Sequence, residues 1–290
     1  MSIRFPAVAA ALLLLAPGAS AATSKTWQQS FTVAGRPTVT ITTNDGHVHV
    51  RTGPAGTVRS EVRYDGRHWG WTSPHRLPDV DLHQAGNAIT VSAREPSVFT
   101  IFGGVWMKLD IDVVVPAECD LQIQTGDGPV TIEDPVVGQL GVRTGDGAIR
   151  VHGARGDLQL RAADGSITAD SLDGSLSART ADGRVVISGR FDRLEVHTGD
   201  GRVDATAGRG SQLADGWRIE TQDGSLTLRI PTDLKAELDA RTGDGRIHFD
   251  LPVSVSGRLD PHAIHGLING GGPPLRLRTS DGALFLAVSE

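Results

Sequence analysis

The sequence predicts an all-β protein whose chain winds into a β-solenoid, that is, a single-stranded β-helix. An Asp-Gly pair recurs nine times with the same kinds of neighbours, apolar residues alternate with polar ones on both sides of each pair, and glycine is frequent, with 36 of 290 residues. Alternation with a period of two is typical of strands that bury one face. Repetition of one unit at a fixed spacing is typical of stacked architectures.

Composition and charge narrow the class further. With 39% hydrophobic residues and a formal net charge of −6, the chain has enough apolar material for a core and too little charge for a disordered protein. The basic residues are scattered along the chain rather than gathered in one segment. Because nucleic-acid binding needs a concentrated basic face, we expect no nucleic-acid partner.

Residues 1–22 have the layout of a secretory signal peptide. Arg4 precedes an apolar run from Ala7 to Ala16, and the small residues around Ala21 form a cleavage site of the Ala-x-Ala type. We therefore expect an exported protein that resides in the periplasm, at the cell surface or in the medium. No later stretch reaches the roughly 18 apolar residues of a membrane span, so none is expected.

Residues 23–117 are predicted to form an N-terminal β region with an aromatic loop insertion. The first Asp-Gly copy lies in this region, and alternating segments after it predict strands at 57–64, 80–83, 88–93 and 107–115. Turn residues separate these segments, which is why we expect them to form individual strands.

The loop after the first of these strands holds the candidate binding residues, which are Trp69, Trp71, His68 and His75. Exposed tryptophans can stack on sugar rings or anchor a protein partner. The competing interpretation is that the loop covers the open end of the solenoid, as a capping element must. An envelope glycan or protein is the expected class of partner, and the sequence identifies no specific one.

Residues 118–290 are predicted to be the β-solenoid repeat domain, with a Gly/Pro-rich insertion at 252–274. From Asp127 onward the aspartates are spaced by 19 residues once and by 18 three times, and by more where loops are inserted. One coil is thus about 18 residues with two strands. The structural turn residues of the nine copies are Asp45, Gly46, Asp127, Gly128, Asp146, Gly147, Asp164, Gly165, Asp182, Gly183, Asp200, Gly201, Asp223, Gly224, Asp244, Gly245, Asp281 and Gly282.

Each copy follows one template. The residues six and four before the aspartate, and three and five after it, are apolar in all nine copies, and a threonine stands two before it in every copy but one, where Ala162 replaces it. We expect the carboxylate to accept a backbone N–H two residues on, in an Asx-turn, and the glycine to adopt a positive φ. A further glycine half a period later, as at Gly156, predicts the second corner.

Two architectures fit this template. In a β-solenoid successive coils stack in parallel, whereas in an antiparallel β meander each Asp-Gly is the turn of a hairpin. Leucine recurs in the same phase in consecutive copies, at Leu140, Leu158 and Leu176 among others, which favours the solenoid. We expect the copy at Asp281, the last in the sequence, to cap the stack.

Few residues of the sequence suggest a metal site or a catalytic site. Stacked aspartates suit calcium, which prefers oxygen ligands, but arginines three residues before several anchors, such as Arg143 and Arg161, supply competing counter-charges. No recognised nucleophile or metal-ligand motif occurs, so no catalytic residue, metal site or cofactor is predicted. Cys119 is expected to be a half-buried small apolar residue.

Several segments resemble the putative adhesin domain of bacterial envelope proteins, a family of unknown function with Thr-Gly-Asp-Gly repeats. The segments that carry the resemblance are 109–116, 121–128, the Thr-Gly-Asp-Gly copies, 269–273 and 278–282, and the similarity covers roughly residues 35 to 290. The resemblance implies a β-solenoid-like fold. It brings no catalytic residue that could be assigned to a position of this chain.

We therefore expect an exported, non-catalytic β-solenoid that acts as an adhesin or as an envelope interaction scaffold. Two alternatives stay open. The first is a carbohydrate-active enzyme, a polysaccharide lyase or hydrolase on a β-helix scaffold, which would need clustered carboxylates with shifted pKa values. The second is a structural module that calcium stiffens.

Overall fold

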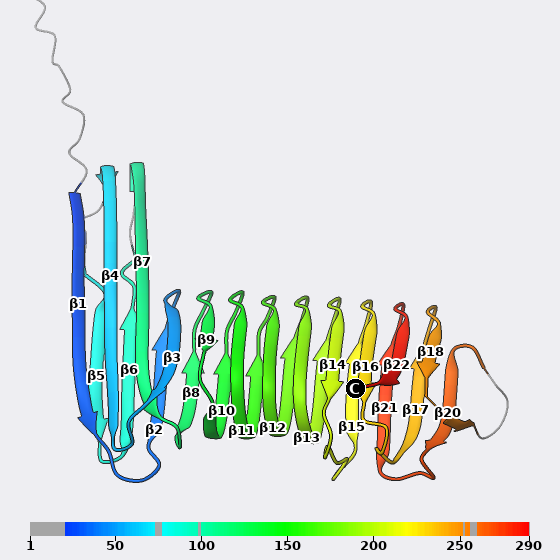
Figure 1. Cartoon of the computed structure of the whole chain (residues 1–290). Helices are drawn as coiled ribbons and strands as arrows, with labels where there is room; N and C mark the ends of the chain where they lie inside the picture. The colour runs from blue at the N-terminus through cyan, green and yellow to red at the C-terminus, as the bar shows by residue number, and fades with distance from the viewer. Residues whose placement is uncertain (1–20, 73–76, 98–99, 252, 256–259, 290) are drawn as a thin grey trace, which may run out of the picture.

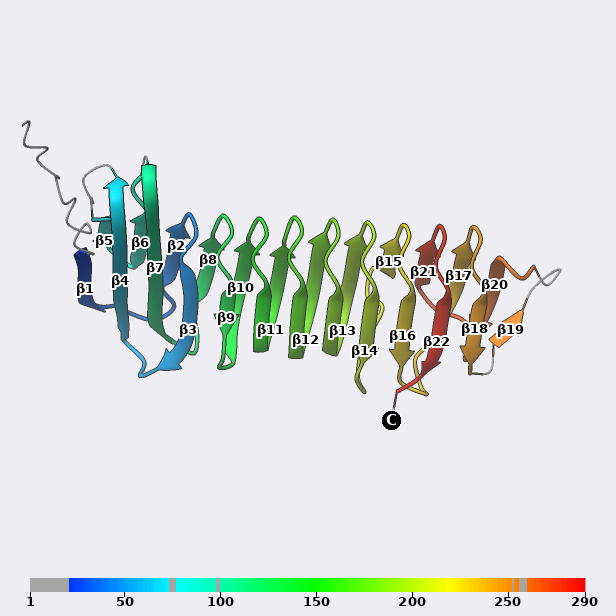
Figure 2. The same cartoon turned by 90° about the horizontal axis from the view of Figure 1, so that it is seen from above.

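The computed structural model describes residues 21–72, 77–97, 100–251, 253–255 and 260–289, and every regular element in them is a β-strand. The strands form two facing layers that are joined at two rows of corners (Figures 1 and 2). We call the layer whose strands precede each Asp-Gly pair the incoming layer, and the layer whose strands follow it the outgoing layer.

The outgoing layer begins with three long antiparallel strands and continues with parallel ones. Its order in space is β1 (Ala21–Thr32), β4 (Thr57–Thr72), β7 (Thr100–Pro116), β3 (His47–Gly53), β9 (Val130–Ile132), the first parts of β11 (Ile149–Arg161), β12 (Ile167–Thr180) and β13 (Val185–Thr198), then β14 (Val203–Ala207), β16 (Leu226–Ile230), β22 (Leu284–Val288) and β18 (Ile247–Asp250). In Figure 1 the strands β4 and β7 extend beyond the rest of the stack.

The incoming layer lies opposite and is antiparallel only at its two ends. Its order in space is β5 (Asp79–Ala85), β6 (Ala88–Arg94), β2 (Thr38–Thr43), β8 (Asp120–Gln124), β10 (Val136–Arg143), the second parts of β11, β12 and β13, then β15 (Trp217–Thr221), β21 (Pro274–Thr279), β17 (Ala236–Thr242), β20 (Ala263–Ile268) and β19 (Val253–Val255).

Parallel, in-register stacking of the repeats confirms the predicted β-solenoid. Leu140 pairs with Leu158, and Leu158 with Leu176, so equivalent side chains of successive coils meet in the core. The meander is wrong for the repeats, because their neighbouring strands are parallel. All the predicted inward residues are buried except two, Ile247 and Phe249, which belong to β18 at the end of the outgoing layer.

The four strands predicted between residues 51 and 116 are present as β4, β5, β6 and β7, and both β4 and β7 are longer than expected. The predicted division at residue 117 remains a prediction, but the layers continue across it, since β2 and β3 pair with β8 and β9.

Of the predicted signal peptide, residues 1–20 lie outside the described residues, and Ala21 and Ala22 begin β1. The described part of the chain holds no helix with the length and apolarity needed to cross a membrane.

The Asp-Gly corner is closed in a different way from the one the sequence suggested. The N–H of Gly183 donates to Thr180 Oγ1 at 3.2 Å, and that hydroxyl donates in turn to the carbonyl oxygen of Ala163 in the preceding coil at 2.9 Å. The expected Asx-turn is wrong, because no backbone N–H among the described residues donates to a corner carboxylate, and a threonine hydroxyl accepts the N–H of the corner glycine instead. The same bond from glycine to threonine recurs at Gly46, Gly224, Gly245 and Gly282.

The glycine of the corner is required for close approach and not for its φ. None of the nine corner glycines has a positive φ, so that expectation is wrong. A Cβ on Gly165 would instead lie under 3.0 Å from the carbonyl oxygen of Gly147, and the same clash recurs between consecutive corners along the stack. The glycines of the second corner do adopt positive φ, with values of +128° at Gly156 and +133° at Gly174.

The order of the coils in space departs from their order in the sequence. The strands of the Asp281 copy, β21 and β22, insert between those of the Asp223 copy and those of the Asp244 copy. The last copy therefore does not cap the stack as expected. The antiparallel strands β20 and β19 cover that end of the incoming layer instead, and they come from the predicted 252–274 insertion.

We expect Gly165→Ala to lower the free energy of unfolding by about 1–3 kcal/mol, the usual effect of forcing extra volume into a packed site. Gly208→Ala is the matched control, because a Cβ there meets only ordinary contacts at 3.4 Å or more. Chemical denaturation of the two variants tests this. Equal stability of both variants would contradict the close-approach explanation.

Cys119 is completely buried, and burial, with a smaller contribution from the charge of Asp120, raises the pKa of its thiol to about 12. Because the thiolate is the reactive form, we expect a soluble thiol reagent at about pH 8 to leave the folded protein unlabelled and to label one thiol after denaturation. Rapid labelling of the folded protein would show that Cys119 is accessible.

Candidate binding surface

The Asp-Gly corners form an acidic ridge along one edge of the stack. We use this name for the nine anchor aspartates, all of which are exposed. None of them forms an ion pair with a described residue, so the arginines of the repeat do not neutralise the ridge directly. In the described part of the chain, no group of three or more His, Cys, Asp or Glu side chains has the geometry to hold a metal ion.

Three residues before each anchor, the outer face of the incoming layer carries a row of side chains that changes charge along the stack. Arg143 pairs in register with Arg161, and Arg161 with Arg179, so three arginines occupy consecutive coils. We call these three the arginine column. Gln124 precedes the column, and His197 and then Glu220 follow it.

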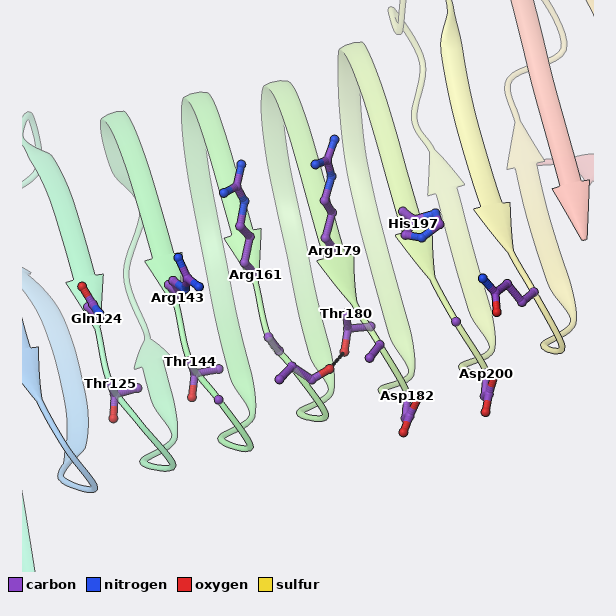
Figure 3. Close-up of a pocket in the computed structure, with 16 residues that line it drawn as sticks. Gln124, Thr125, Arg143, Thr144, Arg161, Arg179, Thr180, Asp182, His197 and Asp200 are labelled. Carbon is purple, nitrogen blue, oxygen red and sulfur yellow. Dashed lines mark hydrogen bonds between the residues drawn. The ribbon is translucent and has the colours of Figure 1, made fainter.

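An open groove of about 670 Å³ lies along this column (Figure 3). The three arginines and His197 line it, together with the threonines and backbone of the corners and two members of the acidic ridge, Asp182 and Asp200. The groove is thus a polar surface with a basic row on one side and carboxylates at its lower edge.

The centre of the groove coincides with the one break in the threonine row. Thr144 and Thr180 are buried in the neighbouring coils, whereas Ala162 between them is only half-buried. Because alanine has no hydroxyl, the coil that carries Arg161 lacks the hydrogen bond to the preceding coil that Thr144 and Thr180 donate. This coil therefore departs from the regular pattern of the corners.

The arginines of the column differ in their partners. Arg179 pairs with Glu195 at 2.5 Å, while Arg143 and Arg161 are exposed and have no ion-pair partner among the described residues. Stacked cations about 4.8 Å apart repel each other by about 1 kcal/mol in water. An anion in the groove would relieve this repulsion.

A second row lies beside the column on the same face, and the polar side chains in it are those of Gln122, Gln159 and Ser177. Gly141 occupies the remaining position of the row, in register between Gln122 and Gln159. These residues border a neighbouring hollow of about 450 Å³ that shares Arg161 and Arg179 with the groove. Amide and hydroxyl groups both donate and accept hydrogen bonds, so this row suits a ligand rich in hydroxyl groups.

The binding residues predicted from the sequence lie elsewhere, at the far end of the outgoing layer. Trp69 and Trp71 belong to β4, opposite Gly104 and Phe102 of β7, but their side chains lie outside what the structure describes, and so does His75. His68 is half-buried in β4. The role of these four residues therefore stays a prediction.

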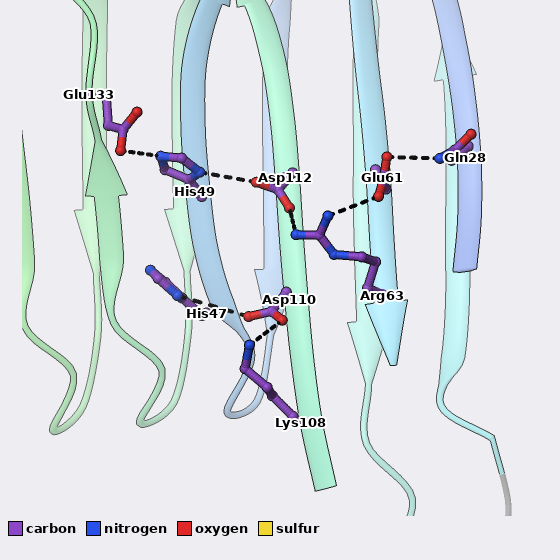
Figure 4. Close-up of polar contacts among 9 residues, drawn as sticks. All are labelled: Gln28, His47, His49, Glu61, Arg63, Lys108, Asp110, Asp112 and Glu133. Atoms are coloured by element: carbon purple, nitrogen blue, oxygen red, sulfur yellow. Dashed lines mark hydrogen bonds and ion pairs between the residues drawn. The ribbon is translucent and has the colours of Figure 1, made fainter. Parts of the chain in front are cut away.

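A polar network crosses the outer face of the outgoing layer near the same end (Figure 4). His49 of β3 contacts Asp112 at 3.0 Å through Nδ1 and Glu133 at 2.8 Å through Nε2. Arg63 of β4 pairs with Asp112 and with Glu61, and Glu61 accepts a hydrogen bond from Gln28 of β1.

Beside this chain of contacts, Asp110 pairs with Lys108 at 2.7 Å and lies 4.0 Å from His47. The network as a whole joins strands β1, β4, β7 and β3 to Glu133, the residue after β9, and these are the strands where antiparallel pairing gives way to parallel pairing. Its basic members already pair with its carboxylates, so we assign it a structural role.

Two carboxyl groups with shifted pKa values lie away from the groove. Burial, followed by the nearby charge of Asp45, raises the pKa of Glu95. Hydrogen bonds from Arg190, with a further contribution from Arg155, lower the pKa of Asp173. Arg190 also binds Asp192, the extra residue of a bulge in β13, so this cluster fixes the second corner.

The groove was not predicted from the sequence. The arginines before the anchors and the exception at Ala162 are visible there, but the arginines were expected to act as counter-charges for the aspartates. Two features taken together would have indicated the site. Arginine occupies the same position in three consecutive copies, and the middle copy is the one in which alanine replaces the threonine.

Comparisons with known proteins bear on the fold. A family model described as Toastrack DUF4097 matches residues 70–286. No curated protein matches the chain at a significant level.

Solved structures that are similar include one described as a putative lipid binding protein from Parabacteroides distasonis, with 13% identity, a TM-score of 0.49, and 90% of this chain and 96% of that chain covered. Another is a putative adhesin from Parabacteroides merdae, with 11% identity, a TM-score of 0.45, and 90% and 96% covered. These likenesses are too distant to carry a function to this chain.

The pairing of Asp173 with Arg190 predicts a pH dependence of stability. A folded-state pKa below the unfolded value of about 3.9 contributes stability above that value, and this contribution is lost as pH falls through the folded pKa. We expect Asp173→Asn to lower the melting temperature near neutral pH and to differ little from the parent protein in acid. Asp157→Asn, on an exposed carboxylate without an ion pair, is the control. A difference that is independent of pH would contradict the ion pair.

Proposed function

We propose, from the premise that the chain belongs to the Toastrack DUF4097 family, a domain of unknown function, that it is an exported, non-catalytic adhesin. In this proposal the protein is a rigid β-solenoid that presents the groove of the arginine column to an elongated anionic partner in the cell envelope or on another cell. The signal-peptide pattern at residues 1–22 supports export.

The observation that carries the proposal is the pair of neighbouring arginines without counter-ions. Other arginines on the outer faces, such as Arg202 and Arg241, are paired with Asp204 and Asp239 at 3.0 Å. Arg143 and Arg161 instead face an open groove, side by side and exposed. Arginine binds carboxylate and related anions through two parallel hydrogen bonds, so two such residues in line favour a ligand with several anionic groups.

The non-catalytic part of the proposal rests on the regularity of the groove's carboxylates. Asp182 and Asp200 occupy the same corner position as the other anchors, with glycine after them and a buried threonine before them. Acid–base catalysis on a glycoside needs two carboxyl groups in different environments, so that one is protonated and the other ionised. Two equivalent corner residues do not provide that difference.

We expect the double variant Arg143→Gln/Arg161→Gln to bind immobilised dextran sulfate about tenfold or more weakly than the parent protein, because it loses two charge-assisted contacts. The matched control is Arg150→Gln/Arg184→Gln, which removes the same charge from exposed arginines of the outgoing layer. Binding is measured as retention on the matrix at increasing salt.

If both double variants bind equally weakly, the interaction depends only on the net charge of the protein, and the groove is not the binding site. Incubation of the parent protein with polysaccharides, followed by an assay for reducing ends and for unsaturated products, tests the non-catalytic part. Turnover that depends on a groove carboxylate would overturn it.

A further inference from the structure

We propose, building on the proposed function, that the groove binds a linear polysaccharide with one carboxylate on each sugar, a polyuronate, and that the polymer lies along the stack. Successive carboxylates of the polymer would contact Arg143, Arg161 and Arg179. The sugar hydroxyls would contact the neighbouring row of amide and hydroxyl side chains.

The repeat distance of the arginine column supports this ligand. Because the three arginines are paired in register on adjacent parallel strands, they are spaced by about 4.8 Å, the distance between strands of a sheet. A pyranose residue in an extended polymer chain has nearly the same length. A chain with a carboxylate on every sugar therefore repeats its charge with nearly the period of the arginine column, and rotation about its glycosidic bonds would turn the carboxylates toward the arginines.

The row beside the column supports a sugar backbone. Gln122, Gln159 and Ser177 stand on the same outer face, two residues before the row of arginines, and Gln139 and Ser175 lie further along the same strands. These side chains carry no charge and offer several donors and acceptors, while Asp157 stands in register between Gln139 and Ser175, and Glu195, which follows Ser177, is held by Arg179. A polymer bound with its carboxylates toward the arginines would place its hydroxyl groups against this second row.

The acidic ridge favours a polymer whose charge lies along one edge over a polymer of the same length that is charged on all sides. Asp182 and Asp200 line the lower edge of the groove, the other corner aspartates continue the ridge, and the chain has a net charge of −6. Nucleic acid and polyphosphate have a dense charge that no orientation can turn away from the ridge. A single row of carboxylates can be placed on the arginines with neutral groups around it.

The ends of the column define the length of the site. Gln124 lies before Arg143, and Glu220 follows His197, so the row offers three arginines and one imidazole before a carboxylate interrupts it. Beyond Glu220 the row continues with Arg278 and Arg241, but both of these already pair with Asp239. The footprint is therefore three to four sugar residues. Longer chains would gain no further contact with the column.

The test uses the full chain and oligogalacturonides from the monomer to the hexamer, with affinity measured by calorimetry at low salt. We expect affinity to rise with each added sugar up to the trimer or tetramer and to level off beyond it. The fully methyl-esterified oligomer of the same length is the matched ligand control, since it has the same sugar backbone without charge, and it should not bind.

Two single variants locate the site. Arg161→Gln should weaken binding of the tetramer about tenfold, and Arg143→Gln should weaken it to a similar extent, whereas Arg150→Gln should leave it unchanged. All three residues are exposed, so the variants should keep the melting temperature of the parent protein. Equal binding of charged and esterified oligomers, or no effect of either groove variant, would overturn the proposal.

The outcome separates this proposal from the one on which it rests. If the protein binds dextran sulfate through the arginine column but no polyuronate, the anionic-partner function stands and the polyuronate assignment fails. If it binds neither, both fail. If sedimentation shows salt-sensitive self-association that Arg161→Gln abolishes, the occupant of the column is the acidic ridge of a second copy, and the polyuronate assignment is wrong.

Discussion

The fold depends on the distance of about 4.8 Å between neighbouring coils, because both corners must fit within it. At the Asp-Gly corners each glycine after Gly46 lies against the carbonyl oxygen of the glycine one coil away, and there is no room for a Cβ between them. A threonine hydroxyl joins the two coils by accepting an N–H from its own corner and donating to a carbonyl of the preceding one, as Thr180 does. With the corners fixed in this way, the strands between them are in register, and like side chains meet in the core.

This constraint explains how much of the architecture could be predicted. The period, the inward residues and the stacking of leucines follow from alternation and spacing, which a sequence displays directly. The mechanism of the corner does not, because Asx-turns and positive φ are local properties, whereas the glycine and the threonine of this corner act between coils. The position of the Asp281 copy could not be predicted either, because its template fits equally well at any position in the stack. Its place between two earlier copies follows from the connection through β19 and β20, which takes the chain to the end of the stack and back.

The sequence was sufficient to predict which residues of the candidate site lie on one face, but not which of them have ion-pair partners. Arg143, Arg161 and Arg179 stand in one phase of the repeat, so the sequence places them on one face, three residues before the corner. Their partners depend on side-chain directions in three dimensions. There the aspartates of the ridge stay unpaired, Arg179 turns to Glu195, and the other two arginines remain open to the groove. Ala162 marks the same coil as a departure from symmetry. In a repetitive scaffold of this kind, the same charged residue at the same position of consecutive coils forms a straight row of charges, and such a row suits a repetitive ligand.

The most direct test of the account is cross-linking between neighbouring coils. In a Cys119→Ser background, cysteines at Gln159 and Ser177 occupy paired positions on adjacent parallel strands, within the Cα separation that a disulfide spans. Cysteines at Gln159 and Glu195 lie two coils apart, at about 9.6 Å, and cannot be joined. The account predicts that mild oxidation joins the first pair rapidly and leaves the second pair unjoined. Failure of the first pair, or equal joining of both, would contradict the in-register stack on which the core, the corners and the arginine column all depend.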